Sequence, residues 1–150
     1  MSALKRQEKT AHLGSPATED YLEQIHNLIG TKGYARVVDI ASLLKVTQAS
    51  VTNMIQRMDA DGLVVYERYR GVILTEKGRQ VGADIARRHE VLLRLLSGFG
   101  LAPETLHDDV EGMEHHISKS TLAILTALAD ELERSPALKL KIKRKMVIGK

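Results

Sequence analysis

The segment DVEGMEHHIS, residues 109–118, places three side chains that can bind a cation close together. On a helix, Glu111, Glu114 and His115 occupy positions i, i+3 and i+4, so their side chains share one face. Two neighbouring carboxylates repel each other unless a positive charge lies between them. The spacing therefore leaves two interpretations open, a solvated helix face or a binding site for a divalent cation.

Side chains of the same kinds occur in two other predicted helices. Asp20 and Glu23 form an i, i+3 acidic pair opposite the apolar stripe of the first helix, and His89 interrupts the apolar stripe of a later one. A lone histidine on an apolar face is more often a core or interface residue than a ligand. Carboxylates with imidazole and no thiolate favour a borderline-to-hard ion such as Mn²⁺. A site of five or six such groups argues against zinc, which prefers four ligands.

The composition limits the class of protein. A chain of 150 residues that is 43% hydrophobic predicts one folded domain or two small ones. The absence of cysteine excludes disulfides, thiolate ligands and cysteine nucleophiles. No apolar run approaches the roughly 18 residues of a membrane helix, and residues 1–15 lack the apolar middle of a secretory signal. We therefore expect a cytoplasmic protein with no membrane partner.

The net charge of +3 is unevenly distributed. Residues 139–150 hold six basic residues and no acid, whereas residues 16–138 hold thirteen basic and eighteen acidic residues, a net charge of −5. We expect an N-terminal extension over residues 1–15 and a basic tail over residues 139–150. Basic ends suit a polyanionic partner; a solvated, poorly ordered end is the alternative.

Residues 15–33 predict the first helix. Ser15 is a capping residue, Pro16 suits the first turn, and apolar side chains recur at helical spacing. The residues expected to end this helix are Gly30 and Gly33.

Residues 35–62 predict a helix-turn-helix. A tight turn is expected near Lys45 and Val46, Thr47 is a cap for the second helix, and Gly62 stops it. Such a second helix enters the major groove of DNA and reads base edges. The polar residues on its outer side are Gln48, Ser50, Thr52, Asn53, Gln56 and Arg57.

A β-hairpin is predicted directly after the helix-turn-helix. Residues 63–75 are rich in β-branched and aromatic side chains, with Arg70 and Gly71 near the middle. A hairpin in this position is the wing of a winged helix, and it would place Arg68 and Arg70 near DNA phosphates or the minor groove. We expect a winged-helix domain over residues 16–75.

The rest of the chain predicts only helices. A long helix follows Thr75, a second begins at Pro103 and carries the opening segment, and a third covers residues 120–135. The third is apolar enough to pack against a neighbour such as another subunit. The apolar stripe predicted for the second consists of Leu106, Val110, Met113 and Ile117. The fold class is therefore mainly α, a winged helix followed by an all-helical domain over residues 76–138.

These segments together resemble the manganese transport regulators of the diphtheria-toxin-repressor family of metal-dependent transcriptional repressors. The resemblance covers residues 18–133. It is carried by EDYLEQI, KGYARVVDIA, ASVTNMIQRMDADGLVVYERYRGVILTEKG, RRHE and DVEGMEHH. It implies an N-terminal winged helix on operator DNA, C-terminal helices that form a homodimer, and two Mn²⁺ ions per subunit between the two parts. The metal ligands it implies are Asp20, Glu23, His89, Glu111, Glu114 and His115.

The iron-responsive branch of that family is similar but has methionine and cysteine where this chain has Asp20 and Glu111. Replacing soft sulfur with hard oxygen shifts preference from Fe²⁺ toward Mn²⁺. We therefore expect a Mn²⁺-activated repressor of manganese uptake genes. The alternatives are an iron-responsive regulator and a winged-helix regulator that needs no metal.

A metal-binding hydrolase is a further alternative. The zinc-peptidase pattern H-x-x-E-H would need histidine at position 111, where the chain has Glu111. The sequence also contains no H-E-x-x-H, no G-x-S-x-G and no phosphate-binding glycine loop. We expect no catalysis and no small organic substrate.

Overall fold

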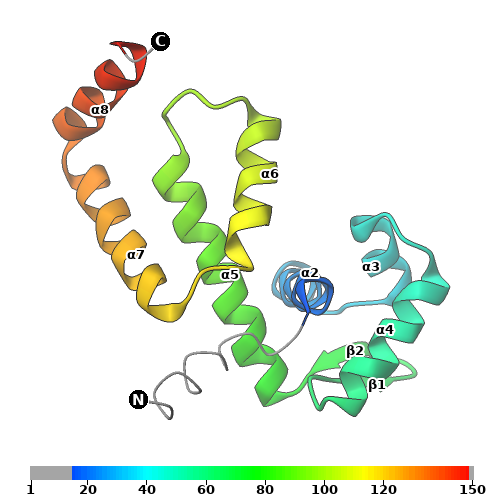
Figure 1. Ribbon diagram of the computed structural model, residues 1–150. Helices are drawn as coiled ribbons and strands as arrows, with labels where there is room; N and C mark the ends of the chain where they lie inside the picture. Colours follow the sequence, from blue (N-terminus) through cyan, green and yellow to red (C-terminus); the bar gives the residue numbers. More distant parts are fainter. Residues whose placement is uncertain (1–14, 149–150) are drawn as a thin grey trace, which may run out of the picture. The chain divides into compact units, whose positions relative to one another are not determined.

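The computed structural model describes residues 15–148 (Figure 1). Except for Ser15, the predicted N-terminal extension lies outside the described residues, as do positions 149 and 150 of the predicted basic tail. The elements are α2 (Pro16–Lys32), α3 (Val37–Leu44), α4 (Gln48–Ala60), β1 (Val64–Glu67), β2 (Gly71–Leu74), α5 (Glu76–Leu96), α6 (Pro103–Glu114), α7 (Lys119–Arg134) and α8 (Pro136–Ile148).

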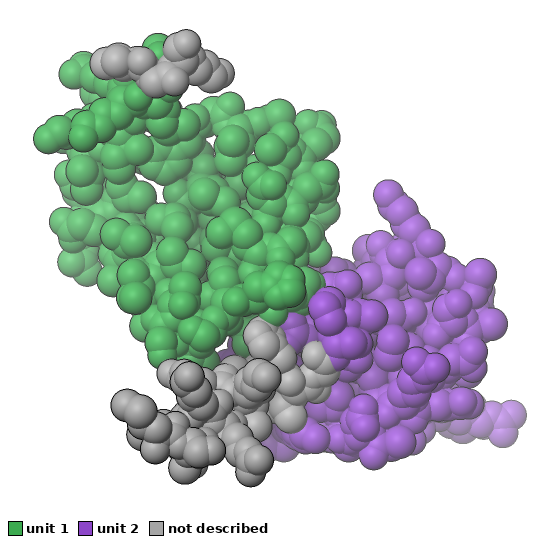
Figure 2. All heavy atoms as spheres, viewed as in Figure 1, with its two compact units in different colours: residues 1–11, 87–150 green, residues 12–86 purple. Residues whose placement is uncertain are grey.

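The chain forms two compact units, shown in different colours in Figure 2. We call described residues 15–86 the N-terminal unit and residues 87–148 the C-terminal unit. The border falls inside α5, so the first half of this helix belongs to one unit and the second half to the other. The folding domains expected over residues 16–75 and 76–138 stay a prediction.

The first helix begins where the sequence predicts. Ser15 has an extended backbone and accepts a hydrogen bond from the Thr18 amide, and Pro16 occupies the first turn. The prediction that Gly30 helps to end the helix is wrong, because α2 continues to Lys32. Gly33 ends it by adopting the left-handed conformation, with φ of 80°.

The predicted helix-turn-helix is formed by α3 and α4. Lys45 adopts the left-handed conformation, with φ of 54°, and thereby turns the chain after α3. Thr47 then caps α4 by accepting a hydrogen bond from the Ser50 amide at 3.2 Å. The buried side of α4 consists of Val51, Ile55 and Met58.

The wing is an antiparallel hairpin of β1 and β2, in which Val64 pairs with Leu74 and Glu67 pairs with Gly71. The segment before α3 joins the wing at Ala35, whose carbonyl oxygen accepts a hydrogen bond from the Val72 amide at 2.8 Å. Gly71 has φ of 82°, and a Cβ at this position would clash with the Ala35 carbonyl. The hairpin after the helix-turn-helix makes this unit a winged helix, as predicted.

One hydrophobic core holds the N-terminal unit together. It joins α2, the helix-turn-helix, the wing and the start of α5. Its fully buried side chains include Leu22, Ile25, Ile40, Met58 and Leu63. Burial of a large apolar side chain stabilises a fold by about 1.5–3 kcal/mol, so this core fixes the helix-turn-helix against the helix that carries Asp20 and Glu23.

The C-terminal unit consists of helices only. Leu92 of α5, Val110 of α6 and Ile117 form its core, and Leu122 and Leu125 of α7 pack against them. Arg94 further ties α5 to α7, because its guanidinium donates hydrogen bonds to Glu133 and Asp130 at 2.7–2.8 Å. These two carboxylates raise the pKa of Arg94, and Arg94 lowers the pKa of Glu133.

Two details of the C-terminal unit differ from the sequence predictions. The alternative of a poorly ordered basic end is wrong up to Ile148, because residues 136–148 form α8. Met113 does not belong to the core, since 41% of it is exposed, and Glu114 is buried instead. No helix in residues 15–148 is both long enough and apolar enough to span a bilayer.

Candidate metal centre and DNA-binding surface

The cation-binding side chains of the C-terminal unit come from two neighbouring helices. His89 lies on α5, Glu111 and Glu114 lie in the last turn of α6, and His115 follows as its C-cap. The α6 helix begins at Pro103, whose fixed φ suits a first turn. The core contact of Leu92 with Val110 holds the two helices together, and this packing sets the position of the four side chains.

These four side chains form two groups of nitrogen and oxygen atoms that share Glu114, one with His89 and Glu111 and the other with His115. His89 Nδ1 lies 2.8 Å from Glu114 Oε2 and 3.6 Å from Glu111 Oε1. His115 Nε2 lies 3.8 Å from the other oxygen of Glu114. Each of His89, Glu111 and Glu114 offers a donor atom within 4.8 Å of the others. Glu114 therefore lies beside both His89 and His115, and Glu111 lies beside His89.

Glu114 is the central residue of the cluster. It is fully buried, and its Oε1 accepts no hydrogen bond from the residues that the structure describes. A buried carboxylate oxygen without a partner costs about 1–3 kcal/mol or more, so a native protein normally satisfies it. A divalent cation satisfies such an oxygen, and carboxylate oxygens with imidazole nitrogens are a donor set that Mn²⁺ accepts. The residues present therefore fit a metal ion.

The acidic pair of the N-terminal unit lies on α2. Glu23 is buried and Asp20 is half-buried. Glu19, which the sequence interpretation left aside, is buried as well, so the acidic face of this helix is not a solvated one. Asp20 and Glu23 lie one turn apart on α2, as the sequence predicts, and their role as metal ligands stays a prediction.

The residues predicted to contact DNA are all on the outside of the N-terminal unit. The six polar residues of α4 are exposed, whereas Val51, Ile55 and Met58 fill the core. Arg68 and Arg70 are both exposed and lie in the turn of the wing, between β1 and β2. An amphipathic helix with a hydrogen-bonding outer face is what major-groove reading requires.

Two family models match adjacent parts of the chain. Residues 14–72 match the iron dependent repressor N-terminal DNA binding domain. Residues 75–142 match the iron dependent repressor metal binding and dimerisation domain. The chain belongs to the iron-dependent repressor family. The first of these matches covers the winged helix, and the second covers the helices with the His89–Glu114 cluster.

Curated relatives in this family are transcriptional regulators. The chain is 46% identical over 122 residues to the HTH-type transcriptional regulator MntR of Lysinibacillus sphaericus, covering 81% of this chain and 88% of the relative. It is 44% identical over 129 residues to the MntR of Bacillus subtilis, covering 86% and 91%. With the MntR of Geobacillus kaustophilus it shares 52% over 104 residues, covering 69% and 74%.

Solved structures of metal-dependent or metal-activated regulators of transcription share the fold. The metal-dependent transcriptional regulator MtsR matches 78% of this chain with a TM-score of 0.69 and 25% identity. The apo form of the manganese-activated repressor ScaR matches 74% with a TM-score of 0.60 and 28% identity. The chain spans about half the length of these two, 55% and 53%.

Proposed function

We propose that this protein is a Mn²⁺-activated transcriptional repressor that binds operator DNA as a homodimer and controls manganese uptake genes in the cytoplasm. The observation that carries the proposal is the cluster around Glu114, a buried carboxylate with one unsatisfied oxygen beside two imidazoles and a second carboxylate. It occurs in a chain whose other unit exposes a polar recognition helix. The MntR relatives support the same function.

The proposed ligands are His89, Glu111, Glu114 and His115 of the C-terminal unit together with Asp20 and Glu23 of α2. We assign two Mn²⁺ ions per subunit to these six side chains. The four carboxylates supply hard oxygen donors, and no thiolate or thioether is among the six. This donor set favours Mn²⁺ over softer competitors, which distinguishes the proposal from an iron-responsive regulator.

The ligands are drawn from both units, so metal occupancy and DNA binding are coupled. Four of the six proposed ligands are carboxylates, and like charges brought together at one site repel each other unless a cation lies between them. Bound Mn²⁺ supplies the positive charge that offsets this repulsion. The recognition helices of a dimer must lie about 34–36 Å apart to enter successive major grooves. Ordered units therefore lower the cost of binding DNA.

In the proposed function, the protein acts by binding metal and DNA and not by catalysis. Its polar clusters have roles in holding metal and DNA, and neither role requires an organic substrate. The elements that act together with the metal centre in this proposal are the helix-turn-helix and the wing, which bind DNA. A metal-binding hydrolase has no use for these two elements.

The test is a DNA-binding titration with controlled metal. A labelled duplex, selected from a random-sequence pool in the presence of MnCl₂, is titrated with protein, and fluorescence anisotropy is read with chelator, Mn²⁺, Zn²⁺ or anaerobic Fe²⁺. We expect strong binding with Mn²⁺ and little with chelator. Equal binding in both conditions would contradict the proposal and leave a winged-helix regulator that needs no metal.

A further inference from the structure

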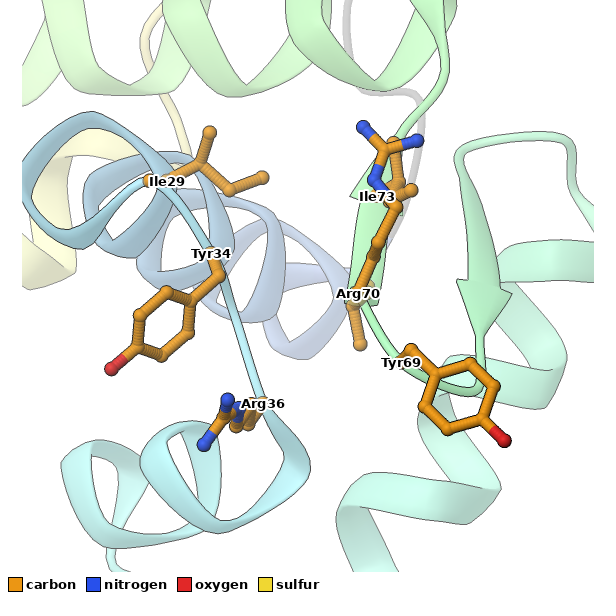
Figure 3. A pocket seen from close by; sticks show the side chains of 8 residues that line it. Ile29, Tyr34, Arg36, Tyr69, Arg70 and Ile73 are labelled. Atoms are coloured by element: carbon orange, nitrogen blue, oxygen red, sulfur yellow. The ribbon is translucent and has the colours of Figure 1, made fainter.

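A cavity of about 320 Å³ lies beside the wing in the N-terminal unit (Figure 3). Tyr34 and Arg36 line one side of it, and Tyr69 and Arg70 come from the turn of the wing. Val72 also lines the cavity. We call this cavity the wing pocket. Two arginines and two tyrosines around one small cavity supply many hydrogen-bond donors.

The backbone explains why these side chains meet. Ala35 is fully buried and bridges to the wing, where the Val72 amide donates to its carbonyl oxygen. Residues on either side of a buried residue in an extended segment point to the opposite face. Tyr34 and Arg36 therefore both point outward, and the bridge places them next to Arg70.

The charges at the wing pocket favour an anion. The Arg36 guanidinium lies 4.7 Å from the centroid of the Tyr34 ring, and this residue forms no ion pair with any residue from 15 to 148. Arg70 lies 3.4 Å from Glu67, but both side chains of this pair are largely exposed, and such a pair contributes little. An arginine that stacks on an aromatic ring has its planar guanidinium N–H groups in a fixed orientation, and these groups can donate hydrogen bonds to a phosphate.

The position of the wing pocket favours a DNA phosphate as the anion. Arg36 is the N-cap residue of α3, the first helix of the helix-turn-helix, and in such motifs the first helix crosses the DNA backbone. The other wall belongs to the wing. We propose that the wing pocket holds a phosphate of the DNA backbone beside the groove that α4 reads, an inference that rests on the proposed function. Arg36 and Tyr34 then position the protein on DNA without reading its sequence.

The experiment measures how DNA binding depends on salt. Four proteins are compared: wild type, Arg36→Ala, Arg36→Lys and Arg134→Ala. Each is titrated, in the presence of saturating Mn²⁺, into the selected duplex and into a scrambled duplex at a series of potassium chloride concentrations. Arg134 is an exposed arginine of α7 and controls for loss of one positive charge. Thermal unfolding of each variant establishes that it is folded; Arg36 is exposed, so its replacement leaves the core intact.

We expect Arg36→Ala to lower the slope of log affinity against log salt by about 0.9, the value for one phosphate contact. Affinity for the selected and scrambled duplexes should fall by similar factors, while Arg36→Lys keeps the slope and Arg134→Ala keeps both slope and affinity.

An Arg36→Ala slope equal to that of wild type would overturn the inference, as would loss of affinity for the selected duplex alone. Wild-type binding that ignores metal would contradict the proposed function instead, and the slope comparison would still decide the role of the pocket. A wild type that binds neither duplex would overturn both.

Discussion

Replacing Glu114 with glutamine tests the metal centre at its most buried ligand. Glutamine has nearly the same volume as glutamate, so Glu114→Gln leaves no cavity in the core between α5 and α6. It removes the negative charge that faces His89 at 2.8 Å. The substitution therefore separates the charge of this residue from its packing.

The size of the expected effect follows from two contributions. In metal-free protein, a charge-assisted hydrogen bond of about 1.5–3 kcal/mol becomes a neutral one of about 0.5–1.5 kcal/mol, so the free energy of unfolding falls by about 1 kcal/mol. For wild type, Mn²⁺ at one hundred times its Kd adds about 2.7 kcal/mol, which corresponds to a Tm increase of about 5–10 °C. A hundredfold weaker site reduces that gain to about 0.4 kcal/mol.

The assay is thermal unfolding with chelator and with Mn²⁺, for wild type, Glu114→Gln and the control Glu104→Gln. Glu104 is an exposed carboxylate in the first turn of the same helix. We expect the Mn²⁺-induced increase in Tm to persist in the control and nearly to vanish in Glu114→Gln. A full Mn²⁺-induced increase in Glu114→Gln would refute the assignment of Glu114 as a ligand. A collapse of its metal-free Tm would show that the carboxylate is primarily structural.

Three further substitutions test other parts of the molecule. Arg57→Ala removes an exposed side chain of α4. Measured by fluorescence anisotropy, it should weaken binding to the selected duplex by about 1–3 kcal/mol and leave the Mn²⁺ affinity of the DNA-free protein unchanged. A change in that Mn²⁺ affinity would contradict a role in DNA reading alone. Gly71→Ala should lower the free energy of unfolding by about 2 kcal/mol or more in a denaturant titration, because φ is 82° and the new Cβ meets the Ala35 carbonyl; unchanged stability would mean that the bridge is dispensable. Since Arg94 lowers the pKa of Glu133, this pair stabilises the fold above the unfolded-state pKa and stops doing so as pH falls. The stability difference between wild type and Glu133→Gln should therefore be present at about pH 7 and decline as the pH falls through the lowered pKa of Glu133 in the folded protein, and a pH-independent difference would refute the pairing.

The winged helix was predictable because local signals and tertiary packing agree there. Thr47 caps α4 as its type and position predict, and the apolar positions of α4 face the core. The end of α2 was less predictable. Gly30 sits inside the helix, which can continue through a glycine at a cost of about 1 kcal/mol, and Gly33 ends it.

Periodicity could not decide which residue of α6 enters the core. At 100° per residue, positions 113 and 114 lie equally far on either side of the line that joins Val110 to Ile117. The sequence interpretation chose the apolar Met113. The structure buries Glu114 instead, beside His89 from another helix, and a contact between helices leaves no local signal.

The helix α8 had a signal that the sequence interpretation did not use. Ser135 precedes Pro136 just as Ser15 precedes Pro16, and its hydroxyl accepts a hydrogen bond from the Leu138 amide. The basic composition drew attention to charge, although lysine, leucine and arginine are good helix formers. The wing pocket was hidden for a different reason, because a bridge at Ala35 brings together residues that lie far apart in sequence.

In the proposed function, the binding of Mn²⁺ and the binding of DNA are coupled. The direct measurement is the Mn²⁺ affinity of the wild-type protein with and without the selected duplex, obtained from the electron paramagnetic resonance signal of free Mn²⁺. Coupling between two binding equilibria is reciprocal. We therefore expect DNA to tighten Mn²⁺ binding by the same factor by which Mn²⁺ tightens DNA binding. A Mn²⁺ affinity that is identical with and without DNA would contradict it.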